Sequence, residues 1–398
     1  MSSELLATIG VSGAASAVEA GRAAAEAARM QQRDRDPQVA MVFASSWFDQ
    51  SRLLEGIRQV LPATPVIGGS TAGELSPEGP TTHHCVLVLL SGDAMVCRVG
   101  VGEDVDRAPR EAGHRAAFRA ADGFPSPQRG GFLFFGDGLA IEYADVLRGL
   151  REVLGTGTVI AGALMGDDLR YDTTYQYAGQ HVVTRAVAGL LIGGTTVVGA
   201  GLEHGYAPIS KPRRVTRAER NVLFELDHQP AAAVYEEYFG HDVVARMRHQ
   251  PMTRPRLAFP LGLHSETADR WLLRNVTALR DDGSLVCSGE VLDGAWLQLM
   301  IGSRELALAA ARRAAQHAVQ GLSRVAAVLV FDSVARRLLL GPHHAAEELR
   351  AVRGVIGPSV PLAGCYTYGE HAVGAQLTGF DAPQTGAILV VALGTPDQ

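Results

Sequence analysis

The sequence is poor in several kinds of residue, and each shortage excludes a class of function. Only one of its 398 residues is a lysine, Lys211, and with 36 basic against 42 acidic residues the net charge is −6. A chain with this balance has no general attraction for nucleic acid or for anionic lipid. No apolar stretch approaches the roughly 20 residues that a membrane-spanning helix requires. We therefore expect no nucleic-acid partner and no insertion into a membrane.

Cysteine is also scarce, and it occurs without the spacing of a metal or redox site. None of the four cysteines belongs to a C-x-x-C pair, and none of the 13 histidines belongs to an H-E-x-x-H motif. The N-terminus lacks the basic and apolar regions of a signal peptide. The missing motifs predict that the protein has no metal site. The lack of a signal peptide predicts a cytoplasmic protein, in which the four cysteines are expected to be reduced thiols.

What the sequence does contain is one ten-residue phrase that occurs twice, Pro-x-x-Gly-x-x-Thr-x-Gly-Glu. The phrase occupies residues 65–74 and again residues 361–370. A degenerate third copy at 159–168 keeps the first glycine and has Asp168 where the other copies have glutamate. Because an internal repeat determines how the rest of a chain is interpreted, we treat this phrase as the organising feature.

The sequence upstream of each copy repeats as well. An apolar run comes first, at 39–43, 131–135 and 327–331, and a segment with apolar residues at helical spacing follows it. Short apolar runs bounded by turns indicate buried strands, and spacings of i, i+3, i+4 and i+7 indicate helices. The fold class we predict is α+β or mixed α/β, with duplicated strand-helix-strand modules and helices packed on the faces of mixed sheets.

Turn signals and a short linker give the expected division of the chain. Residues 91–93 and 281–283 are predicted to be the turns of two β-hairpins. The basic, proline-containing segment 208–214 is the best candidate linker. We expect an N-terminal domain at 1–210 and a C-terminal domain at 211–398, packed together because so short a linker prevents wide separation.

The repeated phrase supplies the candidate ligand-binding residues. Glycine at a strand end lets the backbone turn or lets a ligand approach closely, and ligands of open α/β sheets usually bind at this edge. We expect Glu74 and Glu370 to lie near a cavity, although their identical offsets fit a structural role equally well. The predicted ligand-binding residues are Gly68, Ser70, Thr71, Glu74, Arg336, Tyr366, Thr367 and Glu370.

Two residues allow an alternative function, that of a hydrolase. Gly68-x-Ser70-x-Ala72 is close to the nucleophile elbow G-x-S-x-G, and Cys365 follows a strand and a glycine. No histidine–aspartate pair accompanies Ser70, and a free cysteine is more often packed in a core than reactive. We therefore place a non-enzymatic sensor first, a hydrolase second and a pure protein-interaction scaffold third.

Three stretches together resemble the FIST family of sensory domains. They are residues 65–74, residues 215–235 and residues 331–370, and they occur in the order of a FIST N-terminal and a FIST C-terminal domain. The resemblance implies a small-ligand sensor of bacterial signalling. The family often has a cysteine at the position of Ser333, so we expect no thiol chemistry there.

The resemblance also implies two kinds of ligand and one kind of partner. Amino acids have been proposed as ligands of such domains, and some stand-alone bacterial members are described as haem-binding nitric oxide sensors that regulate histidine kinases. Haem is thus the one cofactor that the resemblance implies, and we single out His204, His371 and His264 as its candidate ligands. A lone histidine is more often structural. Because no kinase, cyclase or DNA-binding segment occurs in the sequence, we expect signalling through a separate protein such as a histidine kinase.

Overall fold

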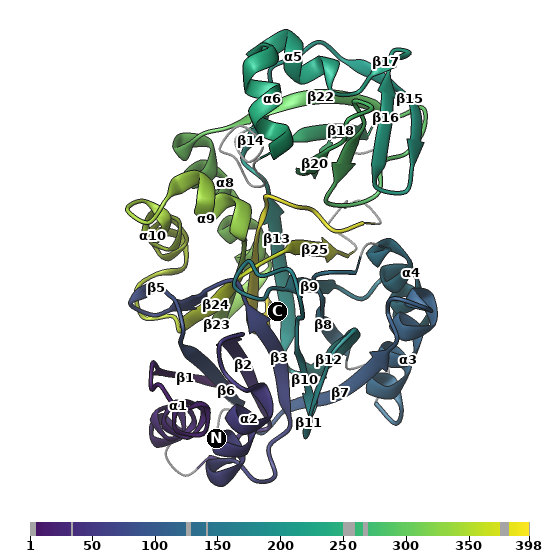
Figure 1. Ribbon diagram of the computed structural model, residues 1–398. Helices are drawn as coiled ribbons and strands as arrows, with labels where there is room; N and C mark the ends of the chain where they lie inside the picture. Colours follow the sequence, from purple (N-terminus) through teal and green to yellow (C-terminus); the bar gives the residue numbers. More distant parts are fainter. Residues whose placement is uncertain are drawn as a thin grey trace.

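The computed structural model describes residues 5–32, 35–124, 129–140, 142–249, 259–265, 270–374 and 382–397. It is a mixed α+β fold, as predicted, in which several mixed sheets are covered by helices (Figure 1). Within the described residues, no helix is both long and apolar enough to cross a membrane.

Three units of similar design make up the body of the molecule. The first unit comprises β1 (Leu6–Ser12), α1 (Ala17–Gln31), β2 (Val39–Ser45), α2 (Gln50–Val60), β3 (Val66–Thr71), β4 (Glu74–Ser76), β5 (Gly79–Thr81) and β6 (Cys85–Ser91). The second comprises β7 (Met95–Glu103), α3 (Pro109–Ala121), β8 (Arg129–Asp137), α4 (Tyr143–Leu154), β9 (Ile160–Met165), β10 (Gln176–Gly179), β11 (His181–Val183) and β12 (Ala186–Gly194). The third comprises β13 (Val197–Glu203), α8 (Arg304–Val319), β23 (Leu322–Ser333), α9 (Val334–Leu340), α10 (Ala345–Ile356), β24 (Leu362–Thr367), β25 (Gly369–Val373) and β26 (Ile388–Pro396).

Each unit forms one sheet, and each sheet receives a strand from another unit. The strand orders are β1-β6-β2-β3-β10-β11, β7-β12-β8-β9-β25 and β13-β26-β23-β24-β4-β5. The second unit thus gives β10 and β11 to the first sheet, the third gives β25 to the second sheet, and the first gives β4 and β5 to the third sheet. This cyclic exchange ties the three units into one body.

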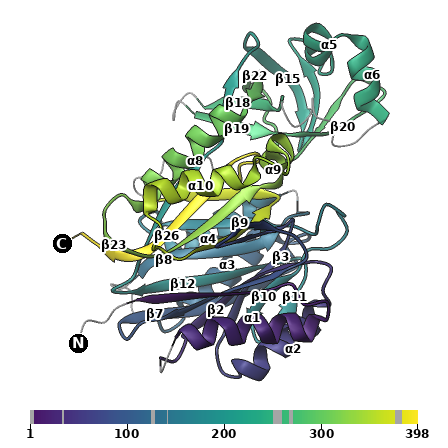
Figure 2. The same ribbon diagram turned by 90° about the vertical axis from the view of Figure 1, so that its left-hand side faces the viewer.

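The inner faces of the three sheets meet in a single core with a threefold arrangement. Phe43 on β2, Phe135 on β8 and Phe331 on β23 are all fully buried. Their ring centroids form a triangle, with separations of 5.8 Å (Phe43 to Phe135), 5.6 Å (Phe43 to Phe331) and 5.7 Å (Phe135 to Phe331). The outer faces are covered by α1 with α2, α3 with α4, and α8 with α10. Figure 2 shows α1 with α2 and α8 with α10 on two of these faces, and Figure 1 shows α3 with α4 on the third. The predicted repeat is therefore a triplication, and the degenerate copy at 159–168 belongs to a complete unit.

The glycine shared by the three copies of the phrase has one steric cause. Gly68, Gly162 and Gly364 lie beside the preceding parallel strand of their own unit. A Cβ atom at these positions would lie 2.0, 2.1 and 1.8 Å from the carbonyl oxygens of Val42, Phe134 and Val330, respectively. No side chain fits so close to a backbone oxygen, so the glycine is explained by strand packing in all three units.

The third unit is interrupted by an inserted domain, residues 204–302, which stands at one end of the body (Figure 1). Its sheet has the order β19-β18-β22-β15-β16-β21-β20, with β14 paired to β22 and β17 paired to β16. The elements are β14 (Tyr206–Pro208), β15 (Arg213–Glu219), β16 (Val222–Leu226), β17 (Gln229–Pro230), α5 (Ala233–Phe239), α6 (His241–His249), β18 (Leu261–Ser265), β19 (Arg270–Arg274), β20 (Val276–Leu279), β21 (Leu285–Cys287) and β22 (Trp296–Gly302).

One of the two predicted hairpins is wrong. Residues 281–283 do connect the paired strands β20 and β21. By contrast, residues 91–93 connect β6 in the first sheet to β7 in the second, because this turn carries the chain from one unit to the next.

The division of the chain into two domains at 210/211 remains a prediction. The third sheet includes strands from both sides of it, since β13 pairs with β26.

Candidate functional site

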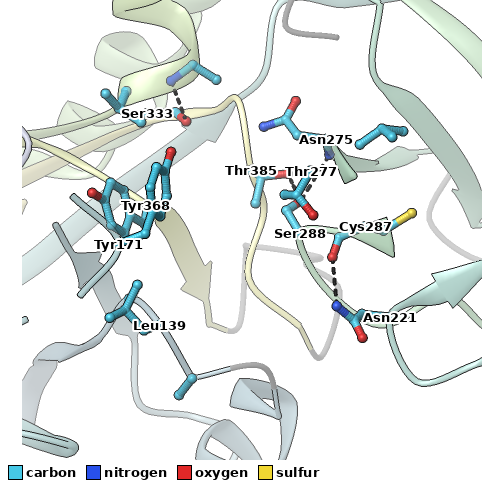
Figure 3. A pocket seen from close by; sticks show the side chains of 15 residues that line it. Leu139, Tyr171, Asn221, Asn275, Thr277, Cys287, Ser288, Ser333, Tyr368 and Thr385 are labelled. Carbon is cyan, nitrogen blue, oxygen red and sulfur yellow. Dashed lines mark hydrogen bonds between the residues drawn. The ribbon is translucent and has the colours of Figure 1, made fainter. Parts of the chain in front are cut away.

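A cavity of about 230 Å³ lies where the inserted domain meets the carboxyl ends of β8 and β23 (Figure 3). The body contributes Leu139, Tyr171, Ser333, Tyr368 and Thr385 to its walls. The inserted domain contributes Asn221, Asn275, Thr277, Cys287 and Ser288. A molecule in this cavity would therefore touch both parts of the protein.

Two stacked tyrosines form the wall on the side of the body. The rings of Tyr171 and Tyr368 lie 5.1 Å apart at an interplanar angle of 16°. The hydroxyl of Tyr368 donates to the buried carboxylate of Asp167. That carboxylate also accepts backbone N–H groups from Tyr171 (3.0 Å), Asp172 (2.6 Å) and Thr173 (3.1 Å). Asp167 thus folds the connection after β9 so that Tyr171 faces Tyr368.

The opposite wall is polar and uncharged, and it holds the inserted domain to the body. Thr385, which precedes β26, donates its hydroxyl to the carbonyl of Leu273 at 3.0 Å and lies 3.1 Å from the hydroxyl of Ser288. The Ser288 hydroxyl accepts the backbone N–H of Asn275 at 2.9 Å. The side-chain oxygen Oδ1 of Asn275 is buried, and no described residue forms a hydrogen bond with it. Buried polar atoms are nearly always paired, so this oxygen is an open acceptor.

A smaller cavity of about 40 Å³ adjoins the first and shares with it Gly138, Ala140, Ser288, Tyr368 and Thr385. Arg274 lines it and is only 2% exposed. Its Nε donates to the carbonyl of Glu290 at 2.8 Å, and its Nη1 donates to the carbonyls of Leu273 (2.9 Å) and Pro383 (3.1 Å). Across the described residues, Nη2 has no hydrogen bond and Arg274 has no ion pair. Burial lowers the pKa of Arg274 to about 10, so the guanidinium is charged at neutral pH.

Tyr143, at the start of α4, lines the same small cavity. Its hydroxyl oxygen is buried and has no hydrogen-bond partner among the residues that the structure describes. Burial raises the pKa of Tyr143 well above its usual value, so the hydroxyl keeps its proton. The small cavity therefore has two groups with open donors, one of them charged.

Comparison with known families identifies the protein class. A FIST N domain model matches residues 38–229, and a FIST C domain model matches residues 231–373. The chain belongs to the FIST family. An uncharacterised protein of Methanocaldococcus jannaschii is 27% identical to this FIST protein over 285 residues, which are 65% of this chain and 53% of that protein. The chain thus matches only about half the length of this relative.

Solved structures resemble the FIST protein only weakly. Cyanuric acid hydrolase from A. caulinodans aligns over 99% of this chain and 100% of its own, at 10% identity and a TM-score of 0.39. PurLQS from Thermotoga maritima aligns over 99% of this chain and 73% of its own, at 13% identity and a TM-score of 0.25. At such low scores, neither likeness supports a conclusion about activity.

The two glutamates of the repeated phrase occupy equivalent, fully buried positions. The hydroxyls of Thr71 and Thr367 donate to Glu74 and Glu370, each at 2.6 Å. The second oxygen of Glu74 accepts the N–H of His84 at 3.1 Å, and that of Glu370 accepts a backbone N–H in the same way. The predicted threonine neighbours are present, but neither glutamate lines the two cavities described above. Their ligand-binding role remains a prediction.

In the second unit, the residue whose position in the sheet is equivalent to Glu74 and Glu370 is Gln176. Asp168, which aligns with the glutamates in the sequence, does not occupy this position in the structure. Glu74 pairs with Cys365 on β24, Glu370 pairs with Ala163 on β9, and Gln176 pairs with Gly69 on β3, each one residue after the shared glycine. A longer connection between β9 and β10 displaces this residue along the sequence. Asp168 instead accepts hydrogen bonds from the hydroxyls of Ser45 (2.8 Å) and Ser46 (2.7 Å).

The remaining predicted ligand residues and both proposed nucleophiles are enclosed. The hydroxyl of Ser70 donates to the carbonyl of Gly166 at 2.7 Å and accepts the N–H of Tyr175 at 2.9 Å. Cys365 is fully buried, and burial raises the pKa of its thiol well above the usual value. Tyr366 is buried beneath the guanidinium of Arg337, which lies 5.1 Å from its ring centre. Arg336 is completely buried in an ion-pair cluster.

The three candidate haem ligands lie on different elements, and none lines the two cavities. His371 on β25 is buried, its ring lies 6.2 Å from that of Phe134, and burial lowers its pKa to about 3. Within the described part of the chain its Nε2 has no hydrogen-bond partner, as a metal ligand would require, but this atom is enclosed in the core. His204 accepts the N–H of Tyr206 at 3.0 Å, and His264 packs against Trp271. These surroundings do not fit haem.

Sequence reasoning missed Arg274, Tyr143 and Asn275. Arg274 lies outside the repeat, so the repeat gave no reason to select it. The available signal was an arginine directly after the apolar residues 271–273, which form the middle of β19. A charged residue in a buried strand needs a partner, and it could have been singled out on that ground.

Proposed function

We propose that this FIST protein is a small-ligand sensor whose ligand binds in the cavity between the body and the inserted domain. The supporting observation is the construction of that cavity, with one wall from each part and hydrogen bonds of Thr385 joining the two. A ligand that contacts both walls favours one relative orientation of the two parts over others. A separate protein can recognise that orientation, and a cytoplasmic histidine kinase is the partner that we propose.

An amino-acid-like molecule fits this proposal better than haem or nitric oxide bound through haem. The cavity walls carry hydroxyl, amide and tyrosine groups together with a buried cation nearby, and such groups bind small polar molecules. The haem alternative lacks support from His204, His371 and His264 because none of them lines the cavity. The hydrolase alternative lacks support from Ser70 and Cys365, both of which are fully buried.

We expect a ligand to raise the melting temperature of the full chain by several degrees in a thermal-shift screen of amino acids. At a ligand concentration about 100 times Kd, the stabilisation is about 2.7 kcal/mol. Leu139→Trp, which fills the cavity from its half-buried rim, should abolish the shift. Leu338→Trp is the matched control, since Leu338 is 39% exposed and lies outside the cavity. A shift that survives Leu139→Trp would place the ligand elsewhere, and a Soret band after incubation with haem would restore the haem alternative.

A further inference from the structure

Resting on the proposed function, we infer that the ligand is a small monocarboxylic acid whose carboxylate binds Nη2 of Arg274 and the hydroxyl of Tyr143. The observation behind it is a buried cation that forms no ion pair within the described residues; the carboxyl of Glu290, which lines the same small cavity, acts on its pKa from a distance only. Arg274 is 2% exposed, and it has no carboxylate partner within the part of the chain that is described. A buried charge is costly unless it is paired, so the position calls for an anion.

The other fully buried arginine shows how this protein neutralises such a charge when no ligand is involved. Arg336 contacts the carboxylates of Asp332 and Glu348, and its remaining donors bind the carbonyls of His204 and Ala307. Arg274 is held by carbonyls alone, which orient a guanidinium without neutralising it. The contrast marks Arg274 as a buried cation with room for a directly bound anion, since Glu290 influences it without forming an ion pair.

The open donors of the small cavity match a carboxylate in number and kind. A guanidinium has five N–H donors. The carbonyls of Glu290, Leu273 and Pro383 take those of Nε and Nη1, so the two of Nη2 remain. Tyr143 adds one O–H, which is buried and unpartnered. An ionised carboxylate only accepts hydrogen bonds, and it can take donors on both oxygens.

The volume of the two cavities limits the size of the acid and places its other polar group. The small cavity of about 40 Å³ has room for little more than a carboxylate, so the rest of the ligand extends into the cavity of about 230 Å³. There the open acceptor Oδ1 of Asn275 calls for an N–H or O–H on the ligand. Short amino acids and hydroxy acids combine these features.

The test is calorimetric titration of the full chain with short-chain amino acids, 2-hydroxy acids and 2-oxo acids, each beside its own amide. At least one acid should bind, and its amide should bind about 100-fold more weakly or not at all, because the charged hydrogen bonds to Nη2 are lost. Binding of an amide as tightly as its acid would overturn the carboxylate inference and leave the sensor proposal standing. If neither acids nor amides bind, both fail.

Substitutions at the two donors separate binding from folding. Tyr143→Phe removes a hydroxyl that has no partner in the unliganded protein, so it should leave the melting temperature unchanged or higher and weaken acid binding about tenfold. Arg274→Gln should weaken binding at least about 100-fold. Arg337→Gln, which removes a half-buried guanidinium that lines a different groove, should leave the affinity unchanged. Full affinity in Tyr143→Phe and Arg274→Gln would overturn the inference.

Discussion

Replacing Arg336 by methionine is expected to destabilise the FIST protein by about 3–5 kcal/mol. The guanidinium is fully buried, and its Nε lies 3.0 Å from Asp332, while its Nη2 contacts Glu348. Both carboxylates are themselves almost completely buried. Removing the arginine leaves these carboxylates without their cation and also takes away one hydrogen-bond donor from each of the carbonyls of His204 and Ala307. Urea unfolding monitored by circular dichroism measures the loss.

The neighbouring arginine provides the control for this substitution. Arg337 is half-buried, makes one hydrogen bond to the carbonyl of Ala72 and lies over the ring of Tyr366. Arg337→Met should therefore cost only about 1–2 kcal/mol. A triple variant in which Asp332, Arg336 and Glu348 are all apolar should recover most of the loss, because apolar replacement of a whole buried cluster is often neutral. Equal losses in the two single variants would contradict the assigned role of Arg336.

The sequence was sufficient to predict the local elements and the repeated module. Apolar runs such as 39–43 and 327–331 became the buried strands β2 and β23, and the helical spacings between them became helices. The repeated glycine also marked a real constraint, since Gly68 and Gly364 lie against backbone oxygens of the preceding strand. These features depend on short-range patterns, and such patterns are visible in one sequence.

The arrangement of the modules could not be predicted in the same way, because it depends on contacts between distant segments. The turn at 91–93 has the composition of a hairpin, yet it carries the chain between two sheets. Nothing local to β4, β10 or β25 indicates that each strand joins the sheet of another unit. The candidate site lies at a junction that forms only after the inserted domain packs on the body, so Arg274 and Tyr143, although far apart in sequence, line one cavity.

Replacing Glu74 by glutamine is expected to remove a pH dependence of stability that this buried carboxyl causes. Burial is the largest influence, and it raises the pKa of Glu74 to about 8 from 4.5. At a pH between these two pKa values, Glu74 keeps its proton in the folded protein and releases it in the unfolded chain. The stabilisation is therefore complete below about pH 4.5 and is lost as the pH rises to about 8. Since one pKa unit corresponds to about 1.4 kcal/mol, the difference between 4.5 and about 8 corresponds to a loss on the order of 5 kcal/mol.

The second unit shows that an amide fits at this position. Gln176 occupies the equivalent register, and its Nε2 donates to the hydroxyl of Thr174 at 3.0 Å. A glutamine at position 74 can likewise donate from Nε2 to the hydroxyl oxygen of Thr71 and accept the N–H of His84 at Oε1, in place of the carboxyl oxygens that contact these groups. Glu74→Gln should match the parent protein near pH 5 and exceed its stability near pH 9 by on the order of 4 kcal/mol. Urea unfolding at both pH values tests this, with the exposed Glu78→Gln as control, and parallel pH profiles for Glu74→Gln and the parent would show that Glu74 is ionised in the folded protein.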